Sequence, residues 1–179
     1  MSAPRRVLVT GGVRSGKSRH AEGLLGAGPA VYVAPGPTTD EDPDPDWAAR
    51  ISAHQRRRPA SWTTIETRDL AAAIASVDRP VLVDCLGTWL TAVLDQADAW
   101  DLPRDDLARL IDDRLNGVEA AVEAFGHDLV VVTNEVGLGV VPAHRSGRVF
   151  RDLLGEVNQR LAALCDEVHL VVAGRVLVL

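Results

Sequence analysis

The chain has 179 residues, of which 46% are hydrophobic and 25% charged, and its formal net charge is −6. This length suits one globular domain, residues 1–179, and the charged fraction is too ordinary for a disordered or fibrous chain. The negative balance disfavours general binding to nucleic acid, which selects a basic surface, and no apolar run approaches the ~20 residues of a membrane-spanning helix.

The first predicted elements are a strand, a phosphate-binding loop and a helix. Residues 11–18 fit the pattern G-x-x-x-x-G-K-[ST] of nucleotide-binding loops. Residues 6–10 before the loop predict a buried parallel strand, and residues 18–25 after it predict a helix whose N-terminus faces the phosphates. We therefore expect a nucleotide phosphate chain to contact the loop residues Gly11, Gly12, Val13, Arg14, Ser15, Gly16, Lys17 and Ser18.

Lys17 stands out because it is the only lysine of the chain, beside 18 arginines. A compact ammonium group suits the β- and γ-phosphates of a nucleotide better than the wide, planar guanidinium does. We therefore expect Lys17 to act on these phosphates and the Ser18 hydroxyl to bind Mg²⁺.

The rest of the chain alternates apolar runs with periodic segments. The apolar runs do not alternate with polar residues, which is typical of strands buried on both faces. They are residues 30–34, 80–84, 129–133 and 168–172. Apolar residues at three- and four-residue steps predict helices over 105–125 and 146–165. Together these segments predict an α/β fold with a mostly parallel, doubly wound sheet.

Residues 35–46 contain four prolines and five acidic residues, which exclude regular structure there. A solvated loop is one interpretation of this segment. The other is a lid or insertion at the mouth of the nucleotide site, because the segment follows the strand expected beside the phosphate loop.

Residues 48–59 begin as a helix and end in a run of arginines. His54 follows Arg50 by four residues, on the same helix face, and Gln55, Arg56, Arg57 and Arg58 come next. A solvated basic surface is the ordinary interpretation. Beside a nucleotide, however, a neutral imidazole could attack a phosphorus atom while arginines neutralise the developing charge.

Two predicted strands end in carboxylates. Asp84 ends the run 80–84, at the edge where an acidic residue holds Mg²⁺ directly or through water. Glu135 follows the run 129–133, and two interpretations of it stay open. It either caps the loop that follows or acts as a base, or as an orienter of a substrate hydroxyl.

These segments together resemble the bifunctional adenosylcobinamide kinase/adenosylcobinamide-phosphate guanylyltransferase family of cobalamin biosynthesis. The resemblance covers nearly the whole chain. Its more specific blocks are Arg50-Ile51-x-x-His54 and Thr133-Asn134-Glu135-Val136-Gly137. Further matches are the stretch 9–22, Arg58-Pro59-x-x-Trp62-x-Thr64-x-Glu66, Asp84-Cys85 and Val157-Asn158-Gln159-Arg160.

The resemblance implies two reactions. ATP or GTP phosphorylates the aminopropanol hydroxyl of adenosylcobinamide, and GTP then transfers GMP to that phosphate through a guanylylated histidine, releasing pyrophosphate. The position that matches this histidine is His54. The implied fold is a three-layer, RecA-like P-loop domain, and the implied assembly is a homotrimer with sites near subunit boundaries. Besides residues 11–18, the implied nucleotide contacts are Ala34, Pro35, Gly36, Gln55, Arg56, Arg57, Arg58, Glu66 and Asp84.

This sequence departs from the family pattern in three places. Asp84 stands where glutamate is usual, so its contact with Mg²⁺ is expected through water. Val13 replaces a usual alanine, and residues 35–46 are longer and richer in proline, which leaves Pro35 and Gly36 as the least secure contacts.

Two other functions remain open from the residues alone, whereas the expected location is the cytoplasm. One function is a P-loop kinase with a single reaction, in which His54 is a bystander; the other is a RecA-like nucleotide-binding ATPase. Cys85 and Cys165 lie far apart in apolar surroundings, typical of reduced thiols in a cytoplasmic protein. The apolar run of residues 7–10 is too short for a signal peptide.

Overall fold

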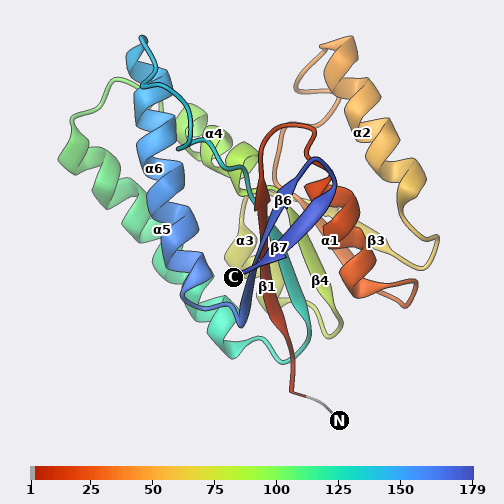
Figure 1. Cartoon of the computed structure of the whole chain (residues 1–179). Coiled ribbons are helices and arrows are strands. Elements are labelled where there is room, and N and C mark those ends of the chain that lie inside the picture. Colours follow the sequence, from red (N-terminus) through yellow and green to blue (C-terminus); the bar gives the residue numbers. More distant parts are fainter. Residues whose placement is uncertain (1–2) are drawn as a thin grey trace.

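The computed structural model describes residues 3–179, and their strands form one seven-stranded sheet. The strand order is β3-β2-β4-β5-β1-β6-β7, and all neighbouring pairs are parallel except β6 and β7 (Figure 1). The bounds are β1 Arg6–Gly11, β2 Val31–Ala34, β3 Thr63–Glu66, β4 Val81–Asp84, β5 Leu129–Val132, β6 Glu167–Val172 and β7 Arg175–Val178.

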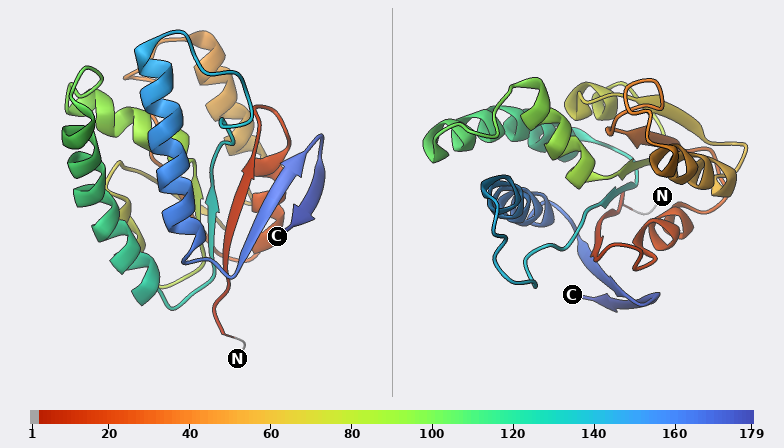
Figure 2. Two further views of the ribbon diagram at one scale, coloured as in Figure 1. Left: turned by 60° about the vertical axis from the view of Figure 1, so that its left-hand side comes forward. Right: turned by 90° about the horizontal axis from the view of Figure 1, so that it is seen from above.

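Helices cover both faces of the sheet and make three layers (Figure 2). Four helices pack on one face around a core that includes Trp89 and Leu154: α3 (Leu70–Ala75), α4 (Leu86–Gln96), α5 (Arg104–Ala124) and α6 (Arg145–Ala162). Helix α1 (Lys17–Leu25) packs on the other face, where Ala21 meets Val9 and Val132. Within residues 3–179, no helix is long and apolar enough to cross a membrane.

The structure confirms the expected α/β class and its buried strands. Strand β5 is buried along its whole length, and β1 is buried beyond its first residue. Such strands need no polar alternation because helices cover both of their faces. The expected helices over 105–125 and 146–165 appear as α5 and α6, each within three residues of the expected bounds.

Four elements are absent from the sequence-based prediction. Helices α3 and α4 lie between residues 70 and 96, and β3 and β7 are the two edge strands of the sheet. Both edge strands are short and largely exposed, and β3, with the sequence Thr-Thr-Ile-Glu, lacks the apolar run that marks a buried strand. The sequence carried a signal for β7, because Gly174 precedes a second apolar run, residues 176–179. In the structure Ala173 and Gly174 have φ of 49° and 75°, as a tight hairpin turn requires.

The expectation that residues 35–46 contain no regular structure is wrong at its end. Helix α2 spans Pro45–Arg57, so its first two residues belong to that segment. Asp44 caps the helix by accepting a 2.9 Å hydrogen bond from the Asp46 N–H. Proline at the first helical position loses no hydrogen bond, since that N–H has no partner within the helix. The acidic, proline-rich composition therefore starts a helix here.

Candidate active site

The phosphate loop joins β1 to α1 at the carboxyl edge of the sheet. Lys17, the first residue of α1, is buried, and its Nζ donates a 3.2 Å hydrogen bond to the Gly12 carbonyl. Gly16 has a φ of 96°, a conformation that side chains rarely adopt. The Gly174 N–H supports the loop by donating to the Ser15 carbonyl at 2.8 Å. The lysine thus folds back over a tightly turned loop, which is the shape of an anion-binding nest.

Two further features of this loop bear on ligand binding. A Cβ at Gly11 would lie 2.4 Å from the Val171 carbonyl oxygen, so only glycine fits between the loop and β6. The Ser15 Oγ is buried and has no hydrogen-bond partner among residues 3–179. Buried hydroxyls are normally paired, so this one is available to a ligand held by the loop.

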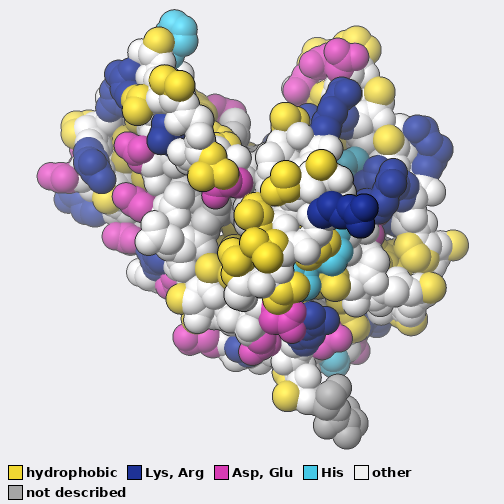
Figure 3. Space-filling model, viewed as in Figure 1, with side chains coloured by type: hydrophobic (Ala, Val, Ile, Leu, Met, Phe, Trp, Pro, Cys, Tyr) yellow, Lys and Arg dark blue, Asp and Glu magenta, His cyan; other side chains and the backbone are white. Residues whose placement is uncertain are grey.

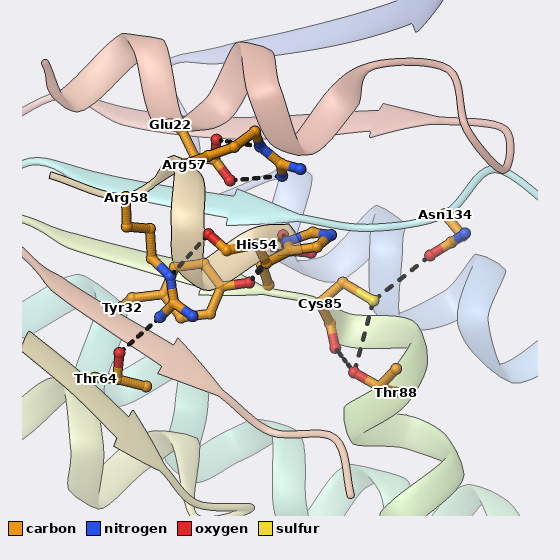
Figure 4. Close-up of polar contacts among 10 residues, drawn as sticks. Glu22, Tyr32, His54, Arg57, Arg58, Thr64, Cys85, Thr88 and Asn134 are labelled. Atoms are coloured by element: carbon orange, nitrogen blue, oxygen red, sulfur yellow. Dashed lines mark hydrogen bonds and ion pairs between the residues drawn. The ribbon is translucent and has the colours of Figure 1, made fainter. Parts of the chain in front are cut away.

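His54 lies near the end of α2 and contacts Tyr32 of β2 and Asp84 at the end of β4. Its Nδ1 is 3.4 Å from the Tyr32 hydroxyl oxygen (Figure 4) and 3.5 Å from Asp84 Oδ2. The Tyr32 hydroxyl in turn donates a 3.1 Å hydrogen bond to Asp84 Oδ2. Within residues 3–179, Nε2 of His54 has no hydrogen-bond partner. Because Asp84 and Tyr32 engage Nδ1, Nε2 is the ring nitrogen free to act on a ligand.

The environment sets the protonation of the groups around His54. Burial raises the pKa of Asp84, but hydrogen bonds from His54, Ser18 and Tyr32 outweigh burial and bring this pKa below its ordinary value. Burial and the charge of Asp84 raise the pKa of Tyr32 well above its ordinary value. Burial likewise raises the pKa of Cys85. At neutral pH the site therefore contains a carboxylate, a phenol that donates and an unreactive thiol.

The arginines that follow His54 do not form one cluster. Arg57 binds Glu22 of α1 through two hydrogen bonds, of 3.0 and 2.9 Å. The Arg58 guanidinium lies 3.9 Å from the centre of the Tyr32 ring and donates to Thr64 Oγ1 at 2.6 Å. Arg56 donates to Ser52 on the outer side of α2. Arg56 and Arg57 are consecutive helical residues and point about 100° apart, whereas Arg58 caps the end of α2 with an extended backbone, so the three arginines face different directions.

Two pockets meet at His54. The first, called here the inner pocket, lies between α2, β2 and β4, and it opens into the notch of Figure 3. Its lining includes Tyr32, Ala34, Gly36, Trp47, Ile51, Gln55, Arg58, Glu66, Asp84, Thr88 and Asn134. The second, called here the cationic recess, is lined by Arg14, Ser15, Gly16, Arg19, Ala53, Arg57 and Gly174. Lys17, Ser18, Arg50 and His54 line both.

Most, but not all, of the site residues expected from the sequence line one of these two pockets. The phosphate loop from Arg14 to Ser18, together with His54, Gln55, Arg58, Glu66 and Asp84, surrounds the two pockets. Val13 is 71% exposed, and Pro35 is buried beside Gly36, which lines the inner pocket. Arg56 lines neither pocket, which differs from the expected run of three phosphate-binding arginines.

Glu135 lies at the start of the loop after β5. Its Oε1 accepts a hydrogen bond of 2.5 Å from the Gly137 N–H, and it does not line either pocket. This contact is the one that the capping interpretation of Glu135 requires. Within the described chain this carboxylate contacts its own loop, and a role for Glu135 in the reaction stays a prediction.

Sequence reasoning missed Tyr32, Trp47, Arg50, Thr88 and Asn134 as members of the site. Tyr32 sits inside an apolar strand, where nothing in the pattern separates it from core residues. Arg50 was visible, because it lies one helical turn before His54 and so shares its face. Trp47 donates to the Pro37 carbonyl and holds residues 36–38 against the inner pocket.

Comparison with known proteins identifies a matching family and several relatives. The family model described as cobinamide kinase / cobinamide phosphate guanyltransferase matches residues 7–179. The bifunctional adenosylcobalamin biosynthesis protein CobU of Salmonella typhimurium is 44% identical over 179 residues, covering 94% of this chain and 96% of that protein. CobU of Escherichia coli is 41% identical, with the same coverage. The bifunctional protein CobP of Pseudomonas aeruginosa is 40% identical over 178 residues, covering 94% of each chain.

Proposed function

The chain belongs to the cobinamide kinase / cobinamide phosphate guanyltransferase family, and from that premise we propose that it carries out both reactions as one catalytic domain. ATP or GTP phosphorylates the aminopropanol hydroxyl of adenosylcobinamide. GTP then transfers GMP to adenosylcobinamide phosphate, giving adenosylcobinamide-GDP and pyrophosphate. The observation that carries the proposal is the position of His54, where the inner pocket meets the cationic recess of the phosphate loop.

In the guanylyl step, GTP lies across both pockets. Its nucleoside occupies the inner pocket and its triphosphate reaches the phosphate loop, so that the α-phosphorus faces His54. Nε2 attacks this phosphorus, the bond to the β-phosphate oxygen breaks, and the electron pair leaves on pyrophosphate. The Nδ1 proton stays between Asp84 and Tyr32, so the carboxylate stabilises the positive charge that the ring acquires.

In the second half of this step, the bond between His54 and the GMP group is broken. A phosphate oxygen of adenosylcobinamide phosphate attacks the α-phosphorus, the Nε2–P bond breaks, and its electron pair returns to the imidazole. Asp84 and Tyr32 keep the ring in one orientation through both halves, which is the role of an orienting partner in a nucleophile–carboxylate pair.

In the kinase step, the phosphate loop and Lys17 act on the phosphoryl group in transfer. Lys17 is buried, so its charge is poorly screened and attracts the β- and γ-phosphate oxygens strongly. The Ser15 hydroxyl, which has no partner within residues 3–179, adds one more donor at the loop. These groups stabilise the charge of the transferred phosphoryl group without taking part in covalent chemistry.

The donor set also fits Mg²⁺. The Ser18 hydroxyl lies beside the Asp84 carboxylate, and both line the inner pocket. Mg²⁺ in nucleotide sites typically takes one or two protein oxygens, with phosphate oxygens and water completing its shell. Ser18 would bind the ion directly and Asp84 through water. When bound, Mg²⁺ neutralises phosphate charge and orients the nucleotide.

GTP labelled at the α- or the γ-phosphate tests the proposal. We expect the α-label alone to form an adduct that is acid-labile and stable to base, and we expect His54→Ala to abolish it. The His127→Ala variant, which changes a histidine outside both pockets, is the matched control and should keep the adduct. A corrinoid that is phosphorylated without any adduct would support a single-reaction kinase. Hydrolysis of the nucleotide alone would support an ATPase.

The proposal extends to assembly and location. We propose a homotrimer, supported by exposed apolar side chains on the β6–β7 hairpin, where Val172 and Leu177 are 61% and 56% exposed. Large exposed apolar patches commonly mark contacts between proteins. A cytoplasmic location is supported by the two cysteines, which are both free. Light scattering that gives a monomer would contradict the trimer.

A further inference from the structure

We propose that Arg50 is the catalytic arginine of guanylyl transfer, and that it stabilises the α-phosphoryl group and the leaving pyrophosphate while His54 attacks. This inference rests on the proposed function. It differs from the expectation based on the sequence, which assigned phosphate binding to the three arginines after His54. Neither the family description nor the names of the relatives assign a role to Arg50.

The first observation concerns the junction of the two pockets. Among the described residues, four line both the inner pocket and the cationic recess. Lys17 and Ser18 belong to the phosphate loop, and His54 is the proposed nucleophile. Arg50 is the fourth member and has no role in the proposal above. A group in this position lies where the α-phosphate must pass from the nucleoside side to the phosphate loop.

The second observation concerns the geometry of α2. Arg50 and His54 are separated by one helical turn, so both side chains project from the same face. Four helical residues rise about 6 Å along the axis, so the helix holds the two side chains at a fixed spacing. A nucleophile and a cation on one helix face can reach the same phosphate, and the cation then lies beside the oxygens of the phosphorus that the nucleophile attacks.

The third observation concerns the partners of the nearby arginines. Within residues 3–179, no carboxylate forms an ion pair with Arg50, and its guanidinium lies 5.8 Å from the centre of the Trp47 ring. Arg57 instead pairs with Glu22, and Arg58 stacks on Tyr32 and binds Thr64. Redirecting either of these to a phosphate would break existing bonds. Arg50 can turn to a phosphate at the cost of only a weak contact with an aromatic ring.

The chemistry of the step explains why an arginine is needed there. As the Nε2–P bond forms and the P–O bond to the β-phosphate breaks, negative charge collects on the α-phosphoryl oxygens and on pyrophosphate. A guanidinium offers a planar pair of N–H donors that matches two phosphate oxygens. Donors aimed at such developing charge typically accelerate a reaction about 10²–10³-fold.

The test is a single-turnover measurement of His54 guanylylation with α-labelled GTP, together with GTP affinity. For Arg50→Gln we expect a rate at least 30-fold lower than wild type, with GTP affinity changed less than threefold. For Arg50→Ala we expect free guanidinium ion to restore part of the rate, which a purely structural role would not allow. Arg114→Gln, the same change at an exposed position of α5, is the matched control and should have the wild-type rate.

Three outcomes would overturn the inference. The first is a wild-type rate of guanylylation in Arg50→Gln. The second is a loss confined to GTP affinity, with no rescue of Arg50→Ala by guanidinium. The third is a loss in Arg56→Gln that equals the loss in Arg50→Gln, which would return the role to the arginine run. A wild-type protein that forms no adduct would contradict the proposed function itself, and a wild-type adduct with an unaffected Arg50→Gln contradicts only the role of Arg50.

Discussion

The Tyr32 hydroxyl, from within β2, donates a 3.1 Å hydrogen bond to the carboxylate of Asp84, the last residue of the adjacent strand β4. Burial and the charge of Asp84 keep Tyr32 protonated, so it donates throughout the physiological pH range. The same carboxylate faces Nδ1 of His54 and the Ser18 hydroxyl. One acidic residue therefore connects the proposed nucleophile with the phosphate loop.

Tyr32→Phe removes this hydroxyl and keeps the ring that supports Arg58. We expect the rate of His54 guanylylation to fall about fivefold, because loss of the hydrogen bond loosens the orientation of Asp84 and of the imidazole, and such a bond contributes about 1 kcal/mol.

Single-turnover rates of wild type and Tyr32→Phe at neutral pH measure this effect. GTP affinity, determined in the same samples, should agree within threefold and serves as the internal control. An unchanged rate would mean that Tyr32 is only a core residue.

Lys17→Arg tests the lone lysine. We expect phosphorylation of the corrinoid to fall at least 100-fold, because the bulkier planar guanidinium does not fit the buried space beside the Gly12 carbonyl. Arg114→Lys, the reverse exchange on the exposed face of α5, is the control and should have wild-type activity. The melting temperature distinguishes a catalytic from a folding defect, and wild-type turnover of a well-folded Lys17→Arg would show that the ammonium is dispensable.

Gly11→Ala, at the start of the phosphate loop, and Gly23→Ala, in helix α1, form a matched pair. A Cβ at Gly11 would meet the Val171 carbonyl at 2.4 Å, whereas a Cβ at Gly23 would meet nothing within 4 Å. We expect Gly11→Ala to lower the free energy of unfolding by about 1–3 kcal/mol through the clash. Gly23→Ala should raise it by about 0.5–1 kcal/mol, since alanine favours the helix interior. Urea denaturation checks both signs, and equal values for the two variants would contradict the close contact.

Glu167→Gln tests a pH dependence of stability far from the site. Hydrogen bonds from Arg5 and His169 lower the pKa of Glu167 from 4.5 to about 2. A folded pKa below the unfolded one means a stabilising contribution that is complete above about pH 4.5 and is lost as the pH falls toward about 2.

We therefore expect the free energy of unfolding of the wild type to fall more steeply between pH 4.5 and 2 than that of Glu167→Gln. Urea denaturation at several pH values in this interval provides the comparison. Parallel curves for the two proteins would show that the Arg5–Glu167–His169 contacts do not stabilise the fold.

The sequence by itself determined the phosphate loop and the central strands. The loop is readable because its glycines, lysine and serine have fixed spacing, and each is required by local backbone or ligand chemistry. The strands β1, β4 and β5 are readable because strands covered on both faces must be apolar throughout. The sequence also singled out His54, because this residue ends the specific motif Arg50-Ile51-x-x-His54.

Only the tertiary structure decided which side chains surround His54. Tyr32, Asp84 and His54 come from β2, β4 and α2, and nothing local in the chain records that these three elements meet. The direction of each arginine also depends on where α2 lies against β2 and α1, which is why Arg50 reaches both pockets and Arg56 reaches neither. Local spacing encodes a loop and a buried strand, whereas a site built from several elements depends on how those elements pack.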